Sequence, residues 1–123
     1  MGERGSVPRW VAVVALAVLP VLVAGPAVAG NAAVRATASN TWDPVRTRVN
    51  HGSRVVWRNP TSIAHTVTAY GGNWSINRTL SPGEHVGRTF DSVGVFRFRC
   101  RFHSTLVAGV CSGMCGKIVV RTA

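Results

Sequence analysis

Apolar and polar side chains alternate along several short stretches of the chain, most clearly over residues 96–102. Phe96, Phe98, Cys100 and Phe102 occupy alternate positions, and an arginine stands at each position between them. A period of two is the pattern of a β-strand with one buried face. We therefore predict a strand that buries an aromatic face together with the Cys100 thiol and presents its guanidinium groups to solvent.

Shorter stretches of the same kind predict further strands. They lie at residues 45–49, 55–57, 65–70, 86–90 and 116–122. Clusters of Gly, Pro, Asn and Ser separate them and are typical of turns. No stretch after residue 30 keeps a 3.6-residue apolar period over three turns, so helices are not expected. Many short strands joined by such turns predict an all-β sandwich or barrel.

The first 29 residues have a different character. Arg4 and Arg9 precede an uncharged run over residues 10–24, and Ala27-Val28-Ala29 follows. A basic start, an apolar middle and small residues before a cut are the layout of a secretory signal peptide. A membrane-spanning helix needs about 20 apolar residues, which is longer than this run. We expect residues 1–29 to be removed and residues 30–123 to form one domain in the periplasm, at the cell surface or in the medium.

The composition adds a strong positive charge. The chain has 14 Lys and Arg against 4 Asp and Glu, a net charge of +10, and only one of the cations is lysine. Guanidinium groups pair well with carboxylates and phosphates, so we expect an acidic redox partner or the anionic cell envelope as a partner. Alternatively, the arginines form only a solvent-exposed sheet face without a binding function. Secretion and the lack of a recognisable motif argue against nucleic acid. With 46% apolar and 15% charged residues, the chain is not of the disordered type.

Candidate metal-binding side chains gather towards the C-terminus. A thiolate, two imidazoles and a thioether come from Cys100, His103, His65 and Met114. This soft ligand set suits copper that changes between its two oxidation states. We expect Cys100 to end its strand, His103 to lie in the following loop and Met114 to begin the return strand. The three would then converge at one end of the sandwich.

At these positions the sequence resembles the cupredoxins, small blue copper proteins such as plastocyanin and pseudoazurin. The segments that carry the resemblance are Trp42-Asp43-Pro44, residues 52–59, His65-Thr66-Val67, Leu80-Ser81-Pro82-Gly83, Phe90, Gly94, Cys100, His103 and residues 113–118. The resemblance implies a Greek-key β-sandwich that holds one mononuclear type 1 copper. It implies His65, Cys100 and His103 as equatorial ligands and Met114 as the weak axial ligand. It further implies a single-electron carrier, not an enzyme, that exchanges electrons through His103; we expect a monomer.

The segment between His103 and Met114 holds ten residues, more than in plastocyanin-like proteins, and it contains Cys111. In an oxidising compartment Cys111 and Cys115 would form a short disulfide that stiffens this loop. Alternatively, the spacing of the two cysteines is similar to the dinuclear copper loop of cytochrome oxidase subunit II, where both thiolates are ligands. Val119 and Thr122 stand where that loop has a histidine and a methionine, which argues against the second hypothesis.

Two other functions are compatible with the sequence. The long loop and its extra cysteines would suit a copper carrier or buffer that hands over its metal without transferring electrons. A metal-free β-sandwich that binds anionic surfaces through its arginines is the third possibility. Reversible one-electron voltammetry, loss of Cu(I) to a chelator, and metal analysis separate the three.

Overall fold

The computed structural model of the protein describes residues 2, 5, 15, 17 and 30–122. Apart from those first four positions, the signal peptide that we expect over residues 1–29 lies outside the described residues. The division of the chain after Ala29 therefore stays a prediction. In the part that is described, no helix is both long enough and apolar enough to cross a membrane.

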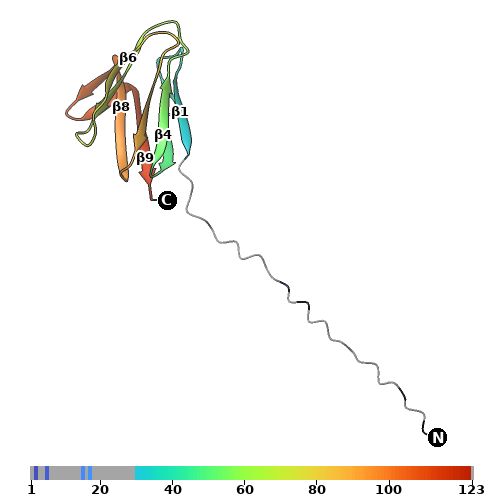
Figure 1. The fold of residues 1–123 in the computed structure, drawn as a ribbon. Helices are drawn as coiled ribbons and strands as arrows, with labels where there is room; N and C mark the ends of the chain where they lie inside the picture. The colour runs from blue at the N-terminus through green and yellow to red at the C-terminus, as the bar shows by residue number, and fades with distance from the viewer. Residues whose placement is uncertain (1, 3–4, 6–14, 16, 18–29, 123) are drawn as a thin grey trace.

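Within residues 30–122, nine strands form two sheets (Figure 1). The four-stranded sheet has the order β2-β1-β4-β7, and its strands are β1 (Asn31–Ala36), β2 (Trp42–Asp43), β4 (Ser53–Arg58) and β7 (His85–Phe90). The five-stranded sheet has the order β3-β9-β8-β5-β6, and its strands are β3 (Arg46–Asn50), β5 (His65–Tyr70), β6 (Asn77–Leu80), β8 (Gly94–Val107) and β9 (Val110–Arg121). The predicted all-β sandwich is confirmed.

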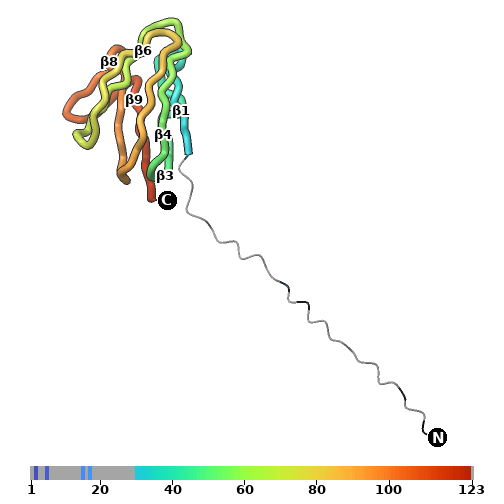
Figure 2. The backbone as a smooth tube through the Cα atoms, viewed as in Figure 1, coloured from blue at the N-terminus to red at the C-terminus, as the bar shows by residue number. Residues whose placement is uncertain are grey.

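Most neighbouring strands are antiparallel, but β1 pairs with β4 and β3 pairs with β9 in parallel. The chain passes repeatedly from one sheet to the other, so the two layers are built together. The C-terminus lies at the same end of the sandwich as the start of β1 (Figure 2). All five further strands predicted from alternation are present, whereas β1, β2 and β6 were not predicted. Val45 is 56% exposed and precedes β3, so the strand that we predicted from residue 45 begins one residue later, at Arg46.

The core between the sheets is aromatic at its centre. The Phe98 ring meets Trp42 and Trp57 edge to face, at centroid distances of 5.6 and 5.3 Å. Its partner across the β8–β9 ladder is Gly116, where any side chain would collide with the Phe98 ring. Glycine at this position therefore lets the ring lie flat against β9. Because Cys100 follows Phe98 by two residues on the same strand face, this packing holds the thiol in the core, fully buried.

Strands β8 and β9 are much longer than predicted and continue into a hairpin beyond the body of the sheet. Val107 pairs with Val110 across a two-residue turn at Ala108-Gly109, and both turn residues have positive φ angles. Positive φ at both central positions is what a tight hairpin turn of this length requires. Residues that we expected in an open ligand loop are therefore held in a β-ladder. The hairpin tip is apolar and exposed, with Val107 at 71% and Val110 at 70%.

Candidate metal centre

Three side chains from two neighbouring strands converge at one end of the sandwich. His65 is the first residue of β5, and Cys100 and His103 belong to β8, which pairs with β5. The ligand atoms of these three residues all lie within 4.8 Å of one another. The Nδ1 atoms of His65 and His103 are 3.8 and 3.4 Å from the Cys100 Sγ atom. The cluster thus offers two nitrogens and one sulfur to a single point.

An irregularity in the β8–β9 ladder creates this convergence. Arg99 pairs with Cys115, but the next pair is Ser104 with Gly113, so four residues of β8 lie opposite Met114 alone. Extra residues on one strand form a bulge, which bends that strand and re-aims its side chains. Here the bulge carries residues 100–103. It brings the His103 imidazole back beside the Cys100 thiol.

Three details predicted for this segment were wrong, two because β8 continues past the cluster and one because of the bulge. Cys100 does not end its strand, and His103 does not lie in a loop, because β8 continues to Val107. Phe102 was predicted on the buried aromatic face, yet its side chain is 55% exposed. Alternation is lost where the ladder register shifts, so Phe102 leaves the face that Phe98 and Cys100 share.

Met114 lies across the ladder from the bulge and is fully buried. Its neighbours on β9 alternate regularly, with Gly116 and Ile118 buried and Lys117 only half-buried. Met114 therefore points to the core side of the strand. The register places it beside the segment that carries Cys100 and His103, and its role as an axial ligand stays a prediction.

Hydrogen bonds determine which nitrogen of His65 faces the thiol. The Thr61 hydroxyl donates to the Asn59 side-chain oxygen at 2.6 Å or to the Ile63 carbonyl at 3.1 Å. Its oxygen, 3.0 Å from His65 Nε2, is then left to accept a hydrogen bond from an N–H group at that nitrogen. The proton on Nε2 leaves Nδ1 with a lone pair, and Nδ1 is the atom directed at the sulfur. His65 is thus held in the tautomer that binds a metal through Nδ1.

Asn59 is the anchor of this arrangement, a role that we did not predict. It is buried, and its amide nitrogen donates to the carbonyls of Ile63 and Leu80 at 2.8 and 2.9 Å. The backbone nitrogen of Thr61 donates to the Asn59 side-chain oxygen at 3.0 Å. These bonds fix the segment that carries Thr61. A pattern of Asn followed two residues later by Thr is a sign of such a turn.

The Cys100 sulfur also has a backbone donor. The Thr66 N–H group donates to Sγ at 3.3 Å, and the Thr66 hydroxyl accepts a bond from the Arg101 N–H group at 2.8 Å. This donor helps to hold the sulfur in its place between the two imidazoles. Among the described residues, Cys100 is the cysteine that remains free.

Burial lowers the pKa of His65, and the charge of the neighbouring His103 lowers it further. The direction keeps the His65 imidazole neutral at neutral pH. A neutral imidazole has the lone pair that a metal needs. The cluster is therefore ready to accept a metal without first releasing a proton from this residue.

This lowered pKa predicts how the stability of the metal-free protein depends on pH. Unfolded, His65 takes up a proton near its ordinary value of 6.5, whereas folded it does so only at lower pH. The unfolded state thus binds more protons in this range, and the free energy of unfolding should fall from about pH 7.5 to about pH 5.5. Urea midpoints should decline less in His65→Gln, whereas His85→Gln, at an exposed site, should keep the wild-type slope. Equal slopes in wild type and His65→Gln would contradict the assignment.

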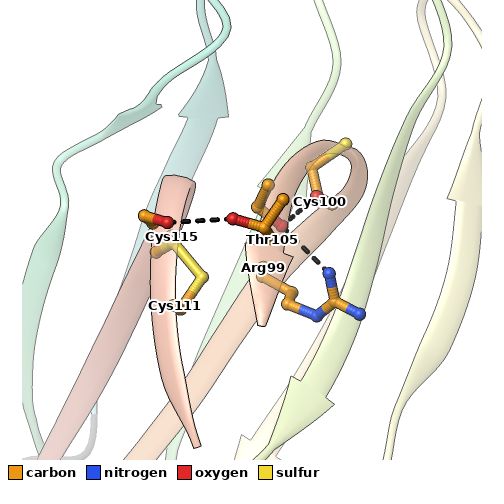
Figure 3. The surroundings of a disulfide bond; sticks show 7 residues. Arg99, Cys100, Thr105, Cys111 and Cys115 are labelled. Atoms are coloured by element: carbon orange, nitrogen blue, oxygen red, sulfur yellow. Dashed lines mark hydrogen bonds between the residues drawn. A yellow bond between two sulfur atoms is a disulfide. The ribbon is translucent and has the colours of Figure 1, made fainter. Parts of the chain in front are cut away.

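Cys111 and Cys115 are joined by a disulfide (Figure 3). Cys115 pairs with Arg99, whose side chain is on the outer face of the sheet, so the disulfide lies on that outer face. Met114, on the same strand, faces the core. Neither cysteine belongs to the cluster of His65, Cys100 and His103. The disulfide connects the protruding hairpin to the body of the sheet, and it uses both thiols that the dinuclear hypothesis required as ligands.

The donor set fits copper. Two imidazoles and one thiolate in a compact group, with a thioether beside them, are the ligands of blue copper sites. A structural zinc site would call for four strong ligands in a closed tetrahedron. Three strong donors and a soft sulfur neighbour therefore match copper better than zinc.

No protein-family model matches the sequence, and no curated protein is similar to it in sequence. Solved structures are similar to it in fold. A purple cupredoxin from Nitrosopumilus maritimus aligns with a TM-score of 0.57 at 19% identity, over 73% of this chain and 99% of that one. A reduced amicyanin mutant aligns with a TM-score of 0.61 at 22% identity, over 74% of this chain and 82% of that one.

This chain has the cupredoxin fold. The resemblance stated from the sequence is thereby confirmed at the level of the fold. A further amicyanin mutant in the oxidised state gives the same result, with a TM-score of 0.60 at 20% identity, over 74% of this chain and 82% of that one. The long β8–β9 hairpin with its disulfide is thus an elaboration on a cupredoxin scaffold.

Proposed function

We propose that the protein is a mononuclear copper protein that carries single electrons between redox partners. The observation that carries the proposal is the convergence of His65, Cys100 and His103 at the end of a cupredoxin sandwich. When bound, copper would supply the one-electron couple. His65, Cys100 and His103 would be the strong ligands and Met114 the weak one.

The surroundings of the cluster support electron transfer more than chemistry on a substrate. His65 and Cys100 are buried and held by Thr61 and Thr66, so the site is rigid in the absence of metal. A prearranged site costs little reorganisation when the charge of its metal changes. His103 is the half-exposed member and lies nearest to a partner. We therefore propose a carrier and not an enzyme.

The cellular setting belongs to the same proposal. Removal of residues 1–29 would deliver residues 30–123 to the periplasm, the cell surface or the medium, where a Cys111–Cys115 disulfide is stable. With its excess of arginine, the mature chain would attract an acidic redox partner and speed the encounter.

Copper titration with voltammetry tests the proposal. One equivalent of Cu(II) added to residues 30–123 should give an intense visible absorption and a reversible one-electron wave with the metal retained. A colourless protein would contradict the copper site. A coloured protein that loses Cu(I) rapidly to a chelator and gives no reversible wave would favour the carrier or buffer function instead.

A further inference from the structure

The outer face of the five-stranded sheet carries a line of cations that the copper site does not use. Seven side chains from three adjacent strands contribute to it, and we call them the cationic stripe. They are Arg46 and Arg48 on β3, Lys117 and Arg121 on β9, and Arg97, Arg99 and Arg101 on β8. Five of them are exposed, and Arg99 and Lys117 are half-buried. The buried residues that alternate with six of them show that these six point away from the core, and Arg101, which lies in the bulge, is exposed.

The registers fix the shape of the stripe. Arg46, Lys117 and Arg97 are direct partners across β3, β9 and β8, so they form one row with neighbouring backbones about 4.8 Å apart. From this row the stripe continues in one direction through Arg48 to Arg121. Arg48 is two residues beyond Arg46 on β3, and Arg121 lies opposite Asn50, two residues beyond Arg48, so each is about 6.8 Å further along the strand direction.

In the opposite direction the stripe continues along β8 through Arg99 to Arg101, next to Cys100. From Arg121 to Arg99 it extends about 20 Å along the strands, at about 3.4 Å per residue, and Arg101 continues it into the bulge. Neutral residues border it on the same face. They include Val95 and Val119 beside Arg48, and Tyr70 and Thr68 beside Arg97 and Arg99. The cations thus form a diagonal track and not a uniform layer.

Nothing on this sheet neutralises the track. None of the five strands contains an Asp or a Glu, and the described acidic residues lie elsewhere, at Asp43 on β2 and at Glu84 and Asp91 beside β7. Among the hydrogen bonds of residues 30–122, one joins a stripe guanidinium to another side chain, from Arg99 to Ser104 at 3.2 Å. Like charges directly opposite one another on neighbouring strands destabilise a sheet. The row through Lys117 therefore costs stability, which a bound anion would offset.

We propose that the cationic stripe binds a linear polyanion, a polymer that carries one carboxylate or phosphate on each monomer. Guanidinium groups engage both anions through paired hydrogen bonds. The short, nearly even steps along the strand direction from Arg121 to Arg99 match a chain of charges laid along the track. A bilayer or a globular acidic protein would present charge over an area, much of which would face Val95, Val119 and Tyr70. The inference is independent of the copper site.

Binding of labelled oligogalacturonate and of inorganic polyphosphate to the copper-loaded mature protein tests the proposal. The test variant combines Arg46→Gln, Lys117→Gln and Arg97→Gln in the central row. The matched control combines Arg35→Gln, Arg54→Gln and Arg58→Gln on the outer face of the four-stranded sheet, with the same loss of charge. We expect the test variant to lose affinity at least about tenfold and to show a weaker salt dependence. The control should change far less.

The two polymers separate carboxylate from phosphate as the preferred group. Equal losses in the test and control variants would overturn the proposal, because net charge alone would then account for binding. Failure of both polymers would also overturn it, as would stripe-dependent binding only to phosphatidylglycerol vesicles or to an acidic protein. The test variant should unfold at the same or a higher temperature, because its row no longer repels itself. A second variant, Arg48→Gln with Arg121→Gln, removes the end of the stripe that lies on β3 and β9. The visible spectrum of each variant shows separately whether its copper site is intact.

Discussion

Replacing Cys100 by serine is expected to abolish the intense visible absorption of the copper-loaded protein and to weaken Cu(II) binding by more than about 100-fold. The sulfur lies 3.8 and 3.4 Å from the Nδ1 atoms of His65 and His103 and accepts the Thr66 N–H bond. A serine hydroxyl is a harder donor that stays protonated at neutral pH, so it cannot replace a thiolate. Copper titration followed by visible spectroscopy measures both effects.

The matched control changes sulfur atoms outside the cluster. Cys111→Ser combined with Cys115→Ser removes the disulfide but leaves His65, Cys100 and His103 in place. This variant should keep its colour, although its hairpin loses a covalent link. If the double variant were colourless and Cys100→Ser stayed blue, the ligand assignment would be wrong and the dinuclear hypothesis would return.

A substitution at Gly113 is expected to damage the site although it replaces none of the proposed ligand residues. Gly113 has a φ of +97°, and an added Cβ would collide with the His103 carbonyl oxygen and crowd Ser104. Gly113→Ala should therefore lower the free energy of unfolding by more than the about 1–3 kcal/mol of an unfavourable φ alone. It should also displace the bulge that carries His103 and so shift the visible spectrum. Urea denaturation and spectroscopy of the copper form check both expectations.

Gly109 provides the comparison, because it also has a positive φ, of +77°, but nothing lies within 4 Å of an added Cβ. Gly109→Ala should show the conformational cost alone and leave the spectrum unchanged. Equal destabilisation in the two variants, with unchanged spectra, would show that contact between Gly113 and His103 does not control the site.

The sequence was informative where one physical pattern ran without interruption. The alternation from Phe96 to Cys100 correctly predicted a strand with the thiol on its buried face. It failed at Phe102, because a bulge has no period and depends on the partner strand. The hairpin was missed for a similar reason. Its turn is Ala108-Gly109, and alanine at a φ of 50° lacks the Asn-Gly or Asp-Gly signal of such turns.

Some residues of the candidate site could likewise be predicted from the sequence, and others could not. Cys100 and His103 could be paired from their spacing, whereas His65, 35 residues before Cys100, depended on the resemblance to cupredoxins. Thr61 and Asn59 could not be found, since their roles follow from how a loop folds back on the start of β5. Short polar residues before a Pro predict a turn from local chemistry, but not which side chain that turn will support.

Strand β8 serves two surfaces at once, with arginines on one side and the Phe98 ring and Cys100 thiol on the other. This restricts how the gene can change in length. One codon inserted between Arg97 and Arg99 would move every following side chain to the opposite face, placing guanidinium groups in the core and the thiol in solvent. Residues 100–113 follow a different rule, because the bulge and the hairpin have already departed from strict alternation. Length variants of this protein should therefore tolerate insertions at the hairpin turn and reject them before Cys100.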